Sequence, residues 1–271
     1  MKAIIIIPAR WDSARLPNKP FVKIKGKEML LRVIEIAQFV KNKRSEIQDV
    51  YVATNDDRII EFCKSHNTKY VFVPEKCRCG TDRVAIAINK LNCDVDFIIN
   101  HQGDNPLCPP WFLEAILDEY IKDSSSEVIT PIINLTWDEL DKLRKLKIDS
   151  PFSGTTTVFD KNHNAIWFTK QILPAIRNEN IMRTKSTKSP VFKHIGIYGY
   201  STNILKKTLS LTASNYMELE GLEQFIFLDN GIKMKLCEVD YKNKGESMPG
   251  INTIDLVKIA EKIIETYGEL V

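Results

Sequence analysis

The stretch that decides the fold is the run AIIIIP, Ala3–Pro8, in which five consecutive apolar residues lead directly into a proline. An apolar run of this length is typical of a strand that is buried on both faces, as in parallel sheets covered by helices on both sides. It is too short for the apolar region of a secretory signal peptide. We therefore expect a first central strand at residues 3–8, followed directly by a polar loop.

Segments of strand length and helix length alternate over the first hundred residues. Further strands are expected at residues 49–54, 69–73 and 96–100, and helices at residues 28–40, 56–65 and 81–91. The first of these helices places Leu30, Val33, Ile34 and Ala37 on one face. Such alternation predicts an α/β fold, a mostly parallel sheet flanked by helices, whose ligand lies beyond the carboxyl ends of the strands.

The pattern is less regular in the second half of the chain. Strands are expected near residues 127–133, 154–159, 195–201 and 233–239, and helices near residues 110–120, 217–229 and 253–267. Residues 177–190 are rich in Arg, Lys, Ser, Thr and Asn, which indicates a mobile surface loop. Because no internal repeat or low-complexity linker is visible, we expect a single domain over residues 1–271.

Composition and charge narrow the class of protein. The chain has 38 Lys and Arg against 35 Asp and Glu, and a net charge of +3 is too balanced to make nucleic acid or an acidic membrane the default partner. No stretch approaches the about 20 apolar residues of a transmembrane helix. Six cysteines without a secretory context indicate a reduced, cytoplasmic protein. Cys77 and Cys79 lack the second Cys or His pair of a structural zinc site, so free thiols are the better interpretation.

The loop after the first strand, residues 8–20, reads PARWDSARLPNKP and gathers Arg10, Ser13, Arg15 and Lys19. Arginine binds phosphate oxygens with two parallel hydrogen bonds and lysine adds a point charge, so this loop is a candidate site for a triphosphate. It contains neither the P-loop motif nor the glycine pattern of dinucleotide-binding folds. Composition alone leaves a merely solvated basic loop equally open.

Two glycine-containing segments are further candidates for binding a metal ion or a nucleotide. The segment from Gln102 to Pro106 follows the fourth expected strand, where Asp104 stands at the position of a metal ligand, and a hard carboxylate suits magnesium. Its composition would also satisfy a simple tight turn. Gly80 and Thr81 either contact a nucleotide or only begin a helix.

Five segments together resemble the CMP-Kdo synthetases, formally the 3-deoxy-manno-octulosonate cytidylyltransferases. The first is IPARxxSxRLPxKP, residues 7–20. The others are CGTDR at residues 79–83, NHQGDNP at 100–106, KHIGIYGY at 193–200 and LEGLEQ at 219–224. Because the matches run in order from residue 4 to beyond residue 250, the resemblance covers nearly the whole chain.

The resemblance implies a nucleotide-diphospho-sugar transferase architecture that is GT-A-like and Rossmann-like. The implied activity joins CMP from CTP to Kdo or a related 3-deoxy ulosonic acid and releases pyrophosphate, for bacterial lipopolysaccharide or capsule. It further implies Mg²⁺, a cytoplasmic homodimer, and CTP and an acidic small molecule as partners, without nucleic acid or membrane. Residues 1–125 would form the CTP-binding half and residues 126–271 the acceptor-binding and dimerisation half.

The resemblance also implies a role for individual residues. Arg15, Lys19 and Asp104 would be catalytic. Asp104 would also bind the metal, with Asn252 as a second candidate ligand. The nucleotide would contact Pro8, Ala9, Arg10, Ser13, Gly80, Thr81, Arg83 and Gln102. The acceptor would contact Gln102, Lys170, His194, Tyr198, Glu223 and Gln224. From the residues alone, His194 and Tyr198 are more often core residues, and Glu223 suits a solvated helix charge.

The sequence departs from the family pattern in the acceptor half. Asn252 replaces a second metal-binding aspartate and is equally suited to cap a helix. Lys170 replaces an arginine and loses the planar fork that pairs a carboxylate. Ile226 replaces another arginine, and SGTTT at residues 153–157 replaces a Val-Lys segment. These changes remove positive charge, so a different acid, such as a modified ulosonic acid or a phosphonate, stays open as the acceptor.

Two interpretations from other classes of protein also stay open. A non-catalytic paralogue that binds CTP is suggested by Asn252, whereas the retention of Arg15, Lys19 and Asp104 argues against it. A nucleic-acid-binding protein is suggested only by the pI of about 8.4 and the basic residues 177–190. The chain carries no recognised nucleic-acid-binding motif, which disfavours the second interpretation.

Overall fold

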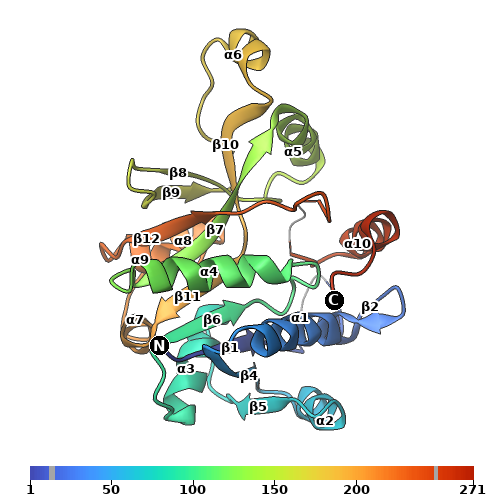
Figure 1. The fold of residues 1–271 in the computed structure, drawn as a ribbon, viewed down its shortest axis with the longest axis vertical. Coiled ribbons are helices and arrows are strands. Elements are labelled where there is room, and N and C mark those ends of the chain that lie inside the picture. The colour runs from blue at the N-terminus through green and yellow to red at the C-terminus, as the bar shows by residue number, and fades with distance from the viewer. Residues whose placement is uncertain (12–15, 247–249) are drawn as a thin grey trace.

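A computed structural model describes residues 1–11, 16–246 and 250–271. Within these residues, ten strands form one mixed sheet in the order β5-β4-β1-β6-β11-β7-β10-β8-β9, with β12 beside β7 (Figure 1). A separate ribbon pairs β2 (Lys23–Ile24) with β3 (Lys27–Glu28). None of the helices described is both long enough and apolar enough to cross a membrane.

The first half of the chain supplies the parallel part of the sheet. Its strands are β1 (Ala3–Pro8), β4 (Ile47–Thr54), β5 (Lys69–Phe72) and β6 (Phe97–His101). The helices between and after them are α1 (Met29–Lys43), α2 (Asp57–Ser65), α3 (Gly80–Leu91) and α4 (Pro110–Lys122). The predicted α/β alternation is confirmed here, with small shifts at the ends of the elements.

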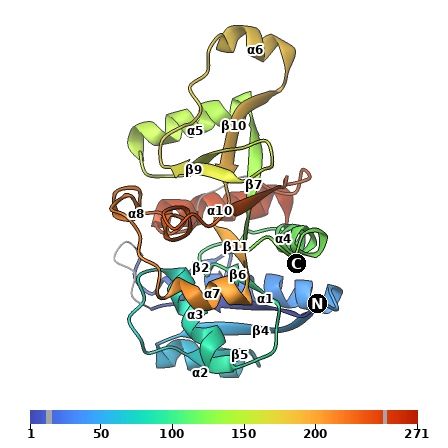
Figure 2. The ribbon, with the colours of Figure 1, turned by 90° about the vertical axis from the view of Figure 1, so that its left-hand side faces the viewer.

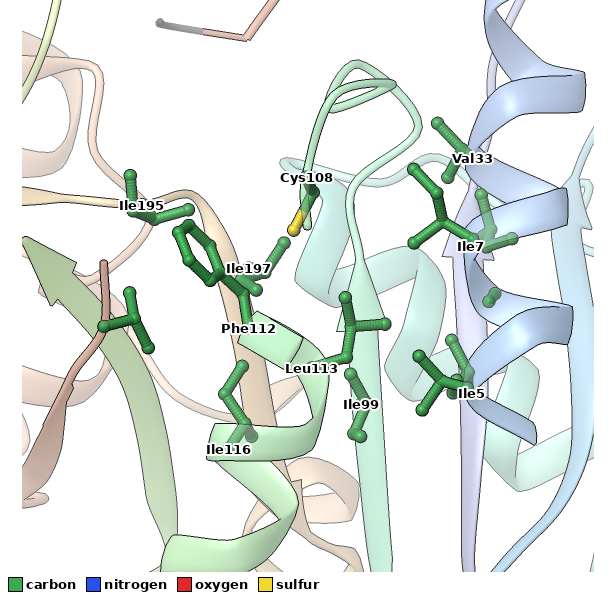
Figure 3. Packing of buried hydrophobic residues seen from close by; sticks show 14 of the residues in the cluster. Ile5, Ile7, Val33, Ile99, Cys108, Phe112, Leu113, Ile116, Ile195 and Ile197 are labelled. Carbon is green, nitrogen blue, oxygen red and sulfur yellow. The ribbon is translucent and has the colours of Figure 1, made fainter. Parts of the chain in front are cut away.

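Strand β1 lies at the centre of this half and is buried on both faces. Ala3, Ile5 and Ile7 pack into a core layer with α1 and α4, whereas Ile4 and Ile6 pack into the opposite layer with α3. Figure 3 shows Ile5 and Ile7 gathered with Ile99 of β6 and Val33 of α1 on the first face. Since burying one isoleucine side chain contributes about 1.5–3 kcal/mol, the apolar run fixes this strand in the middle of the sheet.

The helices divide between the two faces of the sheet. Figure 2 shows α1 and α4 on one side and α3 and α7 (Thr202–Thr208) on the other. A third, smaller apolar cluster joins the C-terminal helix α10 (Ile254–Tyr267) to the first half of the chain through Leu16, Ile24 and Met29. The end of the chain is thereby held beside the loop that follows β1.

The second half of the chain is mainly antiparallel. β11 (Ile197–Ser201) runs antiparallel to β6 and to β7 (Val128–Thr136), and β10 (Lys188–His194) runs antiparallel to β7 and to β8 (Thr156–Phe159). β8 pairs in the same way with β9 (Ala165–Thr169), while β12 (Met234–Glu238) is parallel to β7. The strands of this half therefore extend the parallel sheet without repeating its βα units.

The expected loop at residues 177–190 is wrong, because these residues include helix α6 (Glu179–Lys185) and the beginning of β10. Glu179 pairs with Arg144 of α5 (Trp137–Asp149) at 2.7 Å, and Arg183 pairs with Asp141 of α5 at 2.7 Å. Charged residues that suggest a solvated loop therefore bind one another between two helices.

The expected continuous helix at residues 217–229 is also wrong. The chain forms two short helices instead, α8 (Tyr216–Glu220) and α9 (Phe225–Leu228). Gly221 lies between them with a φ of 63°, in the left-handed region that ends helices. This break turns Glu223 and Gln224 toward the sheet, which matters for the site below.

Gly199 of β11 lies against Ile116 of α4 and Phe97 of β6. A Cβ at this position would lie 2.8 Å from Cε1 of Phe97, and closer still to another atom of Phe97 and to Ile116 of α4. We expect Gly199→Ala to lower the free energy of unfolding by about 1–3 kcal/mol, because these packed side chains would have to shift. Urea denaturation measures this change.

The matched control is Gly196→Ala, since a Cβ there would meet only Nδ2 of Asn105, at 3.8 Å. We expect this control to change the free energy of unfolding by less than about 0.5 kcal/mol. Equal losses in the two variants would contradict the packing explanation.

Candidate functional site

Two adjoining cavities lie at the carboxyl ends of β1 and β6, the edge at which the sequence predicts ligand binding. The smaller has a volume of about 300 Å³ and the larger about 870 Å³. Both are lined by Arg10, Arg78, Cys79, Gly80, Gln102 and Asp104. A ligand in one cavity would therefore meet a ligand in the other along this shared border.

The smaller cavity is lined by the loop after β1 and by the beginning of α3. The loop contributes Pro8, Ala9, Arg10 and Lys19, and α3 contributes Gly80 and Arg83. The structure thus brings these predicted nucleotide contacts together. Ser13 and Arg15, which belong to the same prediction, lie outside the described residues.

Lys19 and Asp104 form an ion pair that joins the loop after β1 to the loop after β6. Nζ of Lys19 lies 2.8 Å from Oδ2 of Asp104, and the two side chains are 19% and 34% exposed. Oδ1 of Asp104 has no hydrogen bond in the part of the chain that the structure describes. The pair therefore leaves one carboxylate oxygen open to a ligand that enters the cavities.

Two glycines allow the loops around the cavities to come close. A Cβ on Gly103 would lie 2.8 Å from the carbonyl oxygen of Pro8, and a Cβ on Gly80 would lie 2.6 Å from Oε1 of Gln102. At Gly103 the obstacle is main chain, which cannot turn aside as a side chain can. The approach of the β1 and β6 ends therefore depends on the absence of a side chain at Gly103.

The first residues of helix α3 have different surroundings: Arg83 lines the smaller cavity, whereas Thr81 contacts β11. Arg83 is nearly buried and donates to Oδ1 of Asn55 and to the carbonyl oxygen of Val73, each at 3.3 Å, and burial lowers its pKa. The hydroxyl of Thr81 instead shares a 2.7 Å hydrogen bond with the hydroxyl of Tyr200, and Thr81 lines neither cavity. Thr81 thus anchors α3 to β11, and its nucleotide contact stays a prediction.

Glu223 connects the first half of the chain to the α8–α9 turn. Its carboxylate accepts hydrogen bonds from the backbone N–H of Thr81, at 3.1 Å, and from Nε2 of Gln102, at 2.9 Å. Burial raises its pKa. Glu223 lines the larger cavity and fixes Gln102 at the border between the two cavities.

His194 holds Gln224 in position. The hydroxyl of Thr130 donates its one proton to the carbonyl oxygen of Ile197 at 2.8 Å, so it accepts from Nε2 of His194 at 2.7 Å. Nδ1 of His194 then accepts from Nε2 of Gln224 at 3.2 Å. Burial lowers the pKa of His194 to about 3, which keeps the ring neutral.

This arrangement leaves Oε1 of Gln224 buried and without a hydrogen-bond partner within the described residues. Tyr198 is also nearly buried, and its ring lies 5.5 Å from that of His194. His194, Tyr198 and Gln224 all line the larger cavity, and their predicted contact with an acceptor stays a prediction. The two ring nitrogens of His194 are already used within the protein, so its contribution is to orient Gln224.

The far wall of the larger cavity is built by residues 150–155 together with Lys170 and Lys193. Nζ of Lys170 donates to the hydroxyl of Thr155 at 2.9 Å, and its backbone N–H donates to Glu220 at 2.7 Å. Asn252 lines the same cavity, whereas Ile226 is fully buried in the core. Lysines therefore remain in this wall although two arginines of the resembled pattern are absent.

Arg78, Cys79 and Lys193 are among the residues that line the cavities but were not predicted from the sequence as site residues. Arg78 binds both oxygens of Asp82, each at 2.8 Å, and lines both cavities. The spacing of four residues between Arg78 and Asp82 is a readable signal of this ion pair. Lys193 stands beside His194 in a recognised segment, but only the structure shows which cavity it lines.

Comparisons with known proteins agree with this arrangement. The sequence pattern of the cytidylyltransferase family matches residues 4–236. The chain is 35% identical over 271 residues to a 3-deoxy-manno-octulosonate cytidylyltransferase of Maricaulis maris, covering 100% of both chains. It is 36% identical over 240 residues to an 8-amino-3,8-dideoxy-manno-octulosonate cytidylyltransferase of Shewanella frigidimarina, covering 88% of this chain and 90% of that one.

The fold is also similar to a solved structure. CMP:2-keto-3-deoxy-manno-octonic acid synthetase, in complex with CTP, superposes with a TM-score of 0.80 and 27% sequence identity. The superposition covers 98% of this chain and 99% of that one. The ten-stranded sheet with its flanking helices is therefore an arrangement that a CTP-binding protein also has.

We expect Thr130→Val to lower the free energy of unfolding by about 1–3 kcal/mol, because valine keeps the shape of threonine but leaves the buried Nε2–H of His194 without an acceptor. Thermal and urea denaturation measure the loss. Thr184→Val, at an exposed position of α6, is the control and should change stability by less than about 0.5 kcal/mol. If Thr130→Val were as mild as the control, the hydrogen-bond chain through His194 would be wrong.

Proposed function

The chain belongs to the cytidylyltransferase family and is a nucleotidyltransferase, and on that premise we propose that it transfers CMP from CTP to Kdo, 3-deoxy-manno-octulosonate, with release of pyrophosphate. The observation that carries the proposal is the pair of adjoining cavities that share Gln102 and Asp104. Transfer requires the nucleotide and the acceptor to meet at one point, and these cavities meet at the carboxyl edge of the parallel strands. The relatives from Maricaulis maris and Shewanella frigidimarina support the class of acceptor.

CTP would occupy the smaller cavity. Arg10 and Lys19 supply positive charge for its phosphates, and Ser13 and Arg15 are proposed from the sequence to join them. Gly80 and Arg83 would contact the nucleoside, and Pro8 and Ala9 also line this cavity. Because Lys19 already lies against Asp104, its ammonium is in place to move onto the departing pyrophosphate.

The acceptor would occupy the larger cavity. Lys170 is the proposed partner of the acceptor carboxylate, with Gln102, Tyr198, Glu223 and Gln224 contacting its remaining polar groups. Neutral His194 would orient Gln224, whose open Oε1 can accept a hydrogen bond from an acceptor hydroxyl. Residues 1–125 thus serve mainly CTP and residues 126–271 mainly the acceptor.

The reaction requires little covalent chemistry from the protein. An oxygen of the acceptor attacks the α-phosphorus of CTP in line, the bond from that phosphorus to the β-phosphate oxygen breaks, and pyrophosphate leaves. Positioning of the two substrates and neutralisation of phosphate charge by Arg15 and Lys19 would supply most of the acceleration. No residue of the chain has to act as a nucleophile.

A magnesium ion fits the residues at the border of the cavities. Magnesium is commonly held by one or two carboxylates together with substrate phosphates, and Asp104 offers a partly exposed carboxylate with one open oxygen. The backbone N–H of Ile251 donates to the carbonyl oxygen of Asp104 at 2.9 Å, which brings the segment of Asn252 to the same place. Asp104 would hold the ion, with Asn252 as a weaker second ligand. The ion would neutralise charge on the phosphates.

The proposed compartment, oligomeric state and use of the product follow from the proposed substrates and the resemblance to the family. We propose a cytoplasmic enzyme, since CTP is made and used there, and a homodimer formed through residues 126–271. The product would serve bacterial surface polysaccharide. The relative from Shewanella frigidimarina gives a second candidate acceptor, 8-amino-3,8-dideoxy-manno-octulosonate, whose reaction would be the same.

The direct test is pyrophosphate release from CTP in the presence of Kdo and magnesium. We expect turnover by the wild-type chain and a loss of about 10²–10³ in kcat in Asp104→Asn, because the border carboxylate is removed without a change in shape. Asp94→Asn is the matched control, since the side chain of Asp94 is 99% exposed. CTP binding without pyrophosphate release, whichever ulosonic acid or phosphonate is supplied as acceptor, would instead favour a non-catalytic paralogue.

A second prediction separates the two cavities. We expect Gln224→Leu to raise the KM for the acceptor by about twofold to tenfold, the effect of one lost hydrogen bond, and to leave the KM for CTP unchanged. Steady-state kinetics with each substrate varied in turn measures both values. If the KM for CTP rose as much as the KM for the acceptor, Gln224 would not belong to the acceptor side.

A further inference from the structure

Lys193 is a buried lysine of strand β10 that faces a cavity of the candidate site. Its residue is 5% exposed, and it lines the larger cavity from strand β10. Within residues 1–11, 16–246 and 250–271, no hydrogen-bond acceptor or carboxylate pairs with its Nζ. A buried charge is costly unless another group compensates it, so a ligand that accepts a hydrogen bond from this ammonium would be favoured in the cavity.

Two charged groups of helix α5 act on Lys193 from outside the cavity, and they have opposite signs. Glu139 favours the ammonium and Lys147 disfavours it, while burial is the largest effect and lowers the pKa of Lys193 to about 8. Glu139 is already engaged, since its carboxylate accepts from the backbone N–H of Thr136 at 2.7 Å. With a pKa of about 8, Lys193 is mainly protonated at neutral pH, and none of the described residues forms an ion pair with it.

The neighbouring wall is also cationic. Nζ of Lys147 donates to the carbonyl oxygens of Ser153, at 2.7 Å, and Gly154, at 3.1 Å, and so holds residues 150–155 in place. A Cβ on Gly154 would lie 3.7 Å from Cε of Lys193, which places the two residues side by side. Lys170 approaches the same loop through Thr155. Residues 150–155 themselves contain no carboxylate.

The carboxylates around the larger cavity are engaged elsewhere or exposed. Asp104 pairs with Lys19, and Glu223 accepts from Thr81 and Gln102. Glu220 accepts from the hydroxyl of Thr169 and from the backbone of Lys170. Glu218 is exposed on α8. The wall near Lys193 therefore offers an approaching ligand positive charge and hydroxyl groups.

We propose that Lys193 determines acceptor choice, by selecting against an acid that carries an ammonium group and in favour of one that carries hydroxyl groups. A hydroxyl oxygen can accept a hydrogen bond from Lys193, whereas a second ammonium in the same buried wall adds repulsion between like charges. The inference rests on the proposed function and decides between its two candidate acceptors, Kdo and the 8-amino acid.

The test compares kcat/KM for Kdo and for 8-amino-3,8-dideoxy-manno-octulosonate in the same enzyme near neutral pH. We expect the wild-type chain to prefer Kdo by about tenfold or more, since two positive charges close together in a buried site repel each other strongly. Lys193→Met removes the charge but keeps an apolar side chain of similar length, and should reduce the preference to about threefold or less. Lys193→Arg should retain the preference.

The matched control is Lys188→Gln, on the same strand, because Lys188 is exposed and lies outside the larger cavity. Its preference should equal that of the wild type. A pH series adds a measurement that a purely structural role would not move: the preference should fall as pH rises through the pKa of Lys193, about 8, and should depend less on pH in Lys193→Met. The difference between the pH profiles of the wild type and Lys193→Met isolates the effect of Lys193, because Lys147 and the amino group of the acceptor titrate in both.

The possible results are distinguishable. Equal use of the two acids by the wild type, or an unchanged preference in a folded Lys193→Met variant, would overturn the inference while leaving the proposed function in place. A wild-type preference for 8-amino-3,8-dideoxy-manno-octulosonate would overturn the inference as well. Turnover of neither acid would contradict the proposed function itself.

Discussion

The pairing of β11 with β6 is the contact on which the rest of the arrangement depends. β6 is bonded to β1 on one side and to β11 on the other, with Ile197 opposite His101 and Ser201 opposite Phe97. The parallel half, which ends in the loop of Gln102 and Asp104, is thereby joined edge to edge with the antiparallel half that carries His194 and Tyr198. A further hydrogen bond, from Nδ2 of Asn105 to the carbonyl oxygen of Gly196 at 2.8 Å, ties the two loops beyond these strands. The two cavities adjoin because the two strands do.

The nucleotide side and the acceptor side of the site differ in how their charges are compensated. On the nucleotide side, the charges of Lys19 and Asp104 neutralise each other, so a phosphate that binds Lys19 competes with Asp104, while the other carboxylate oxygen of Asp104 stays open to a cation. On the acceptor side, the carboxylate of Glu223 is satisfied by Thr81 and Gln102, while the ammonium of Lys193 is left for the ligand. Paired charges that exchange partners suit a substrate that leaves in two pieces. An unpaired buried charge suits the discrimination of one acid from another.

Much of the parallel half could be predicted from the sequence, because an apolar strand such as Ala3–Pro8 is buried whatever its partners are. The position of Lys19, Gly80 and Asp104 beside one cavity could be predicted with it, since they follow strands or begin a helix along the chain. Their contact with a nucleotide stays a prediction. The second half could not be predicted in the same way. Residues 177–190 look solvated, but Arg183 and Glu179 find partners on α5, which is distant in sequence. The position of Lys193 against Gly154 is likewise set by tertiary packing, which no local pattern records. The break at Gly221 is a local feature instead, since glycine favours the positive φ that ends a helix.

In the proposed reaction, the two substrates meet at the Gln102–Asp104 border and the bond broken there is the one between the α- and β-phosphates. CTP labelled with ³²P at either the α or the γ position, incubated with the enzyme, magnesium and Kdo, shows directly which bond breaks. We expect the α label to be recovered in the CMP-linked sugar acid and the γ label in pyrophosphate. Recovery of the γ label in the acceptor, or its release as inorganic phosphate without any α label in the acceptor, would contradict it.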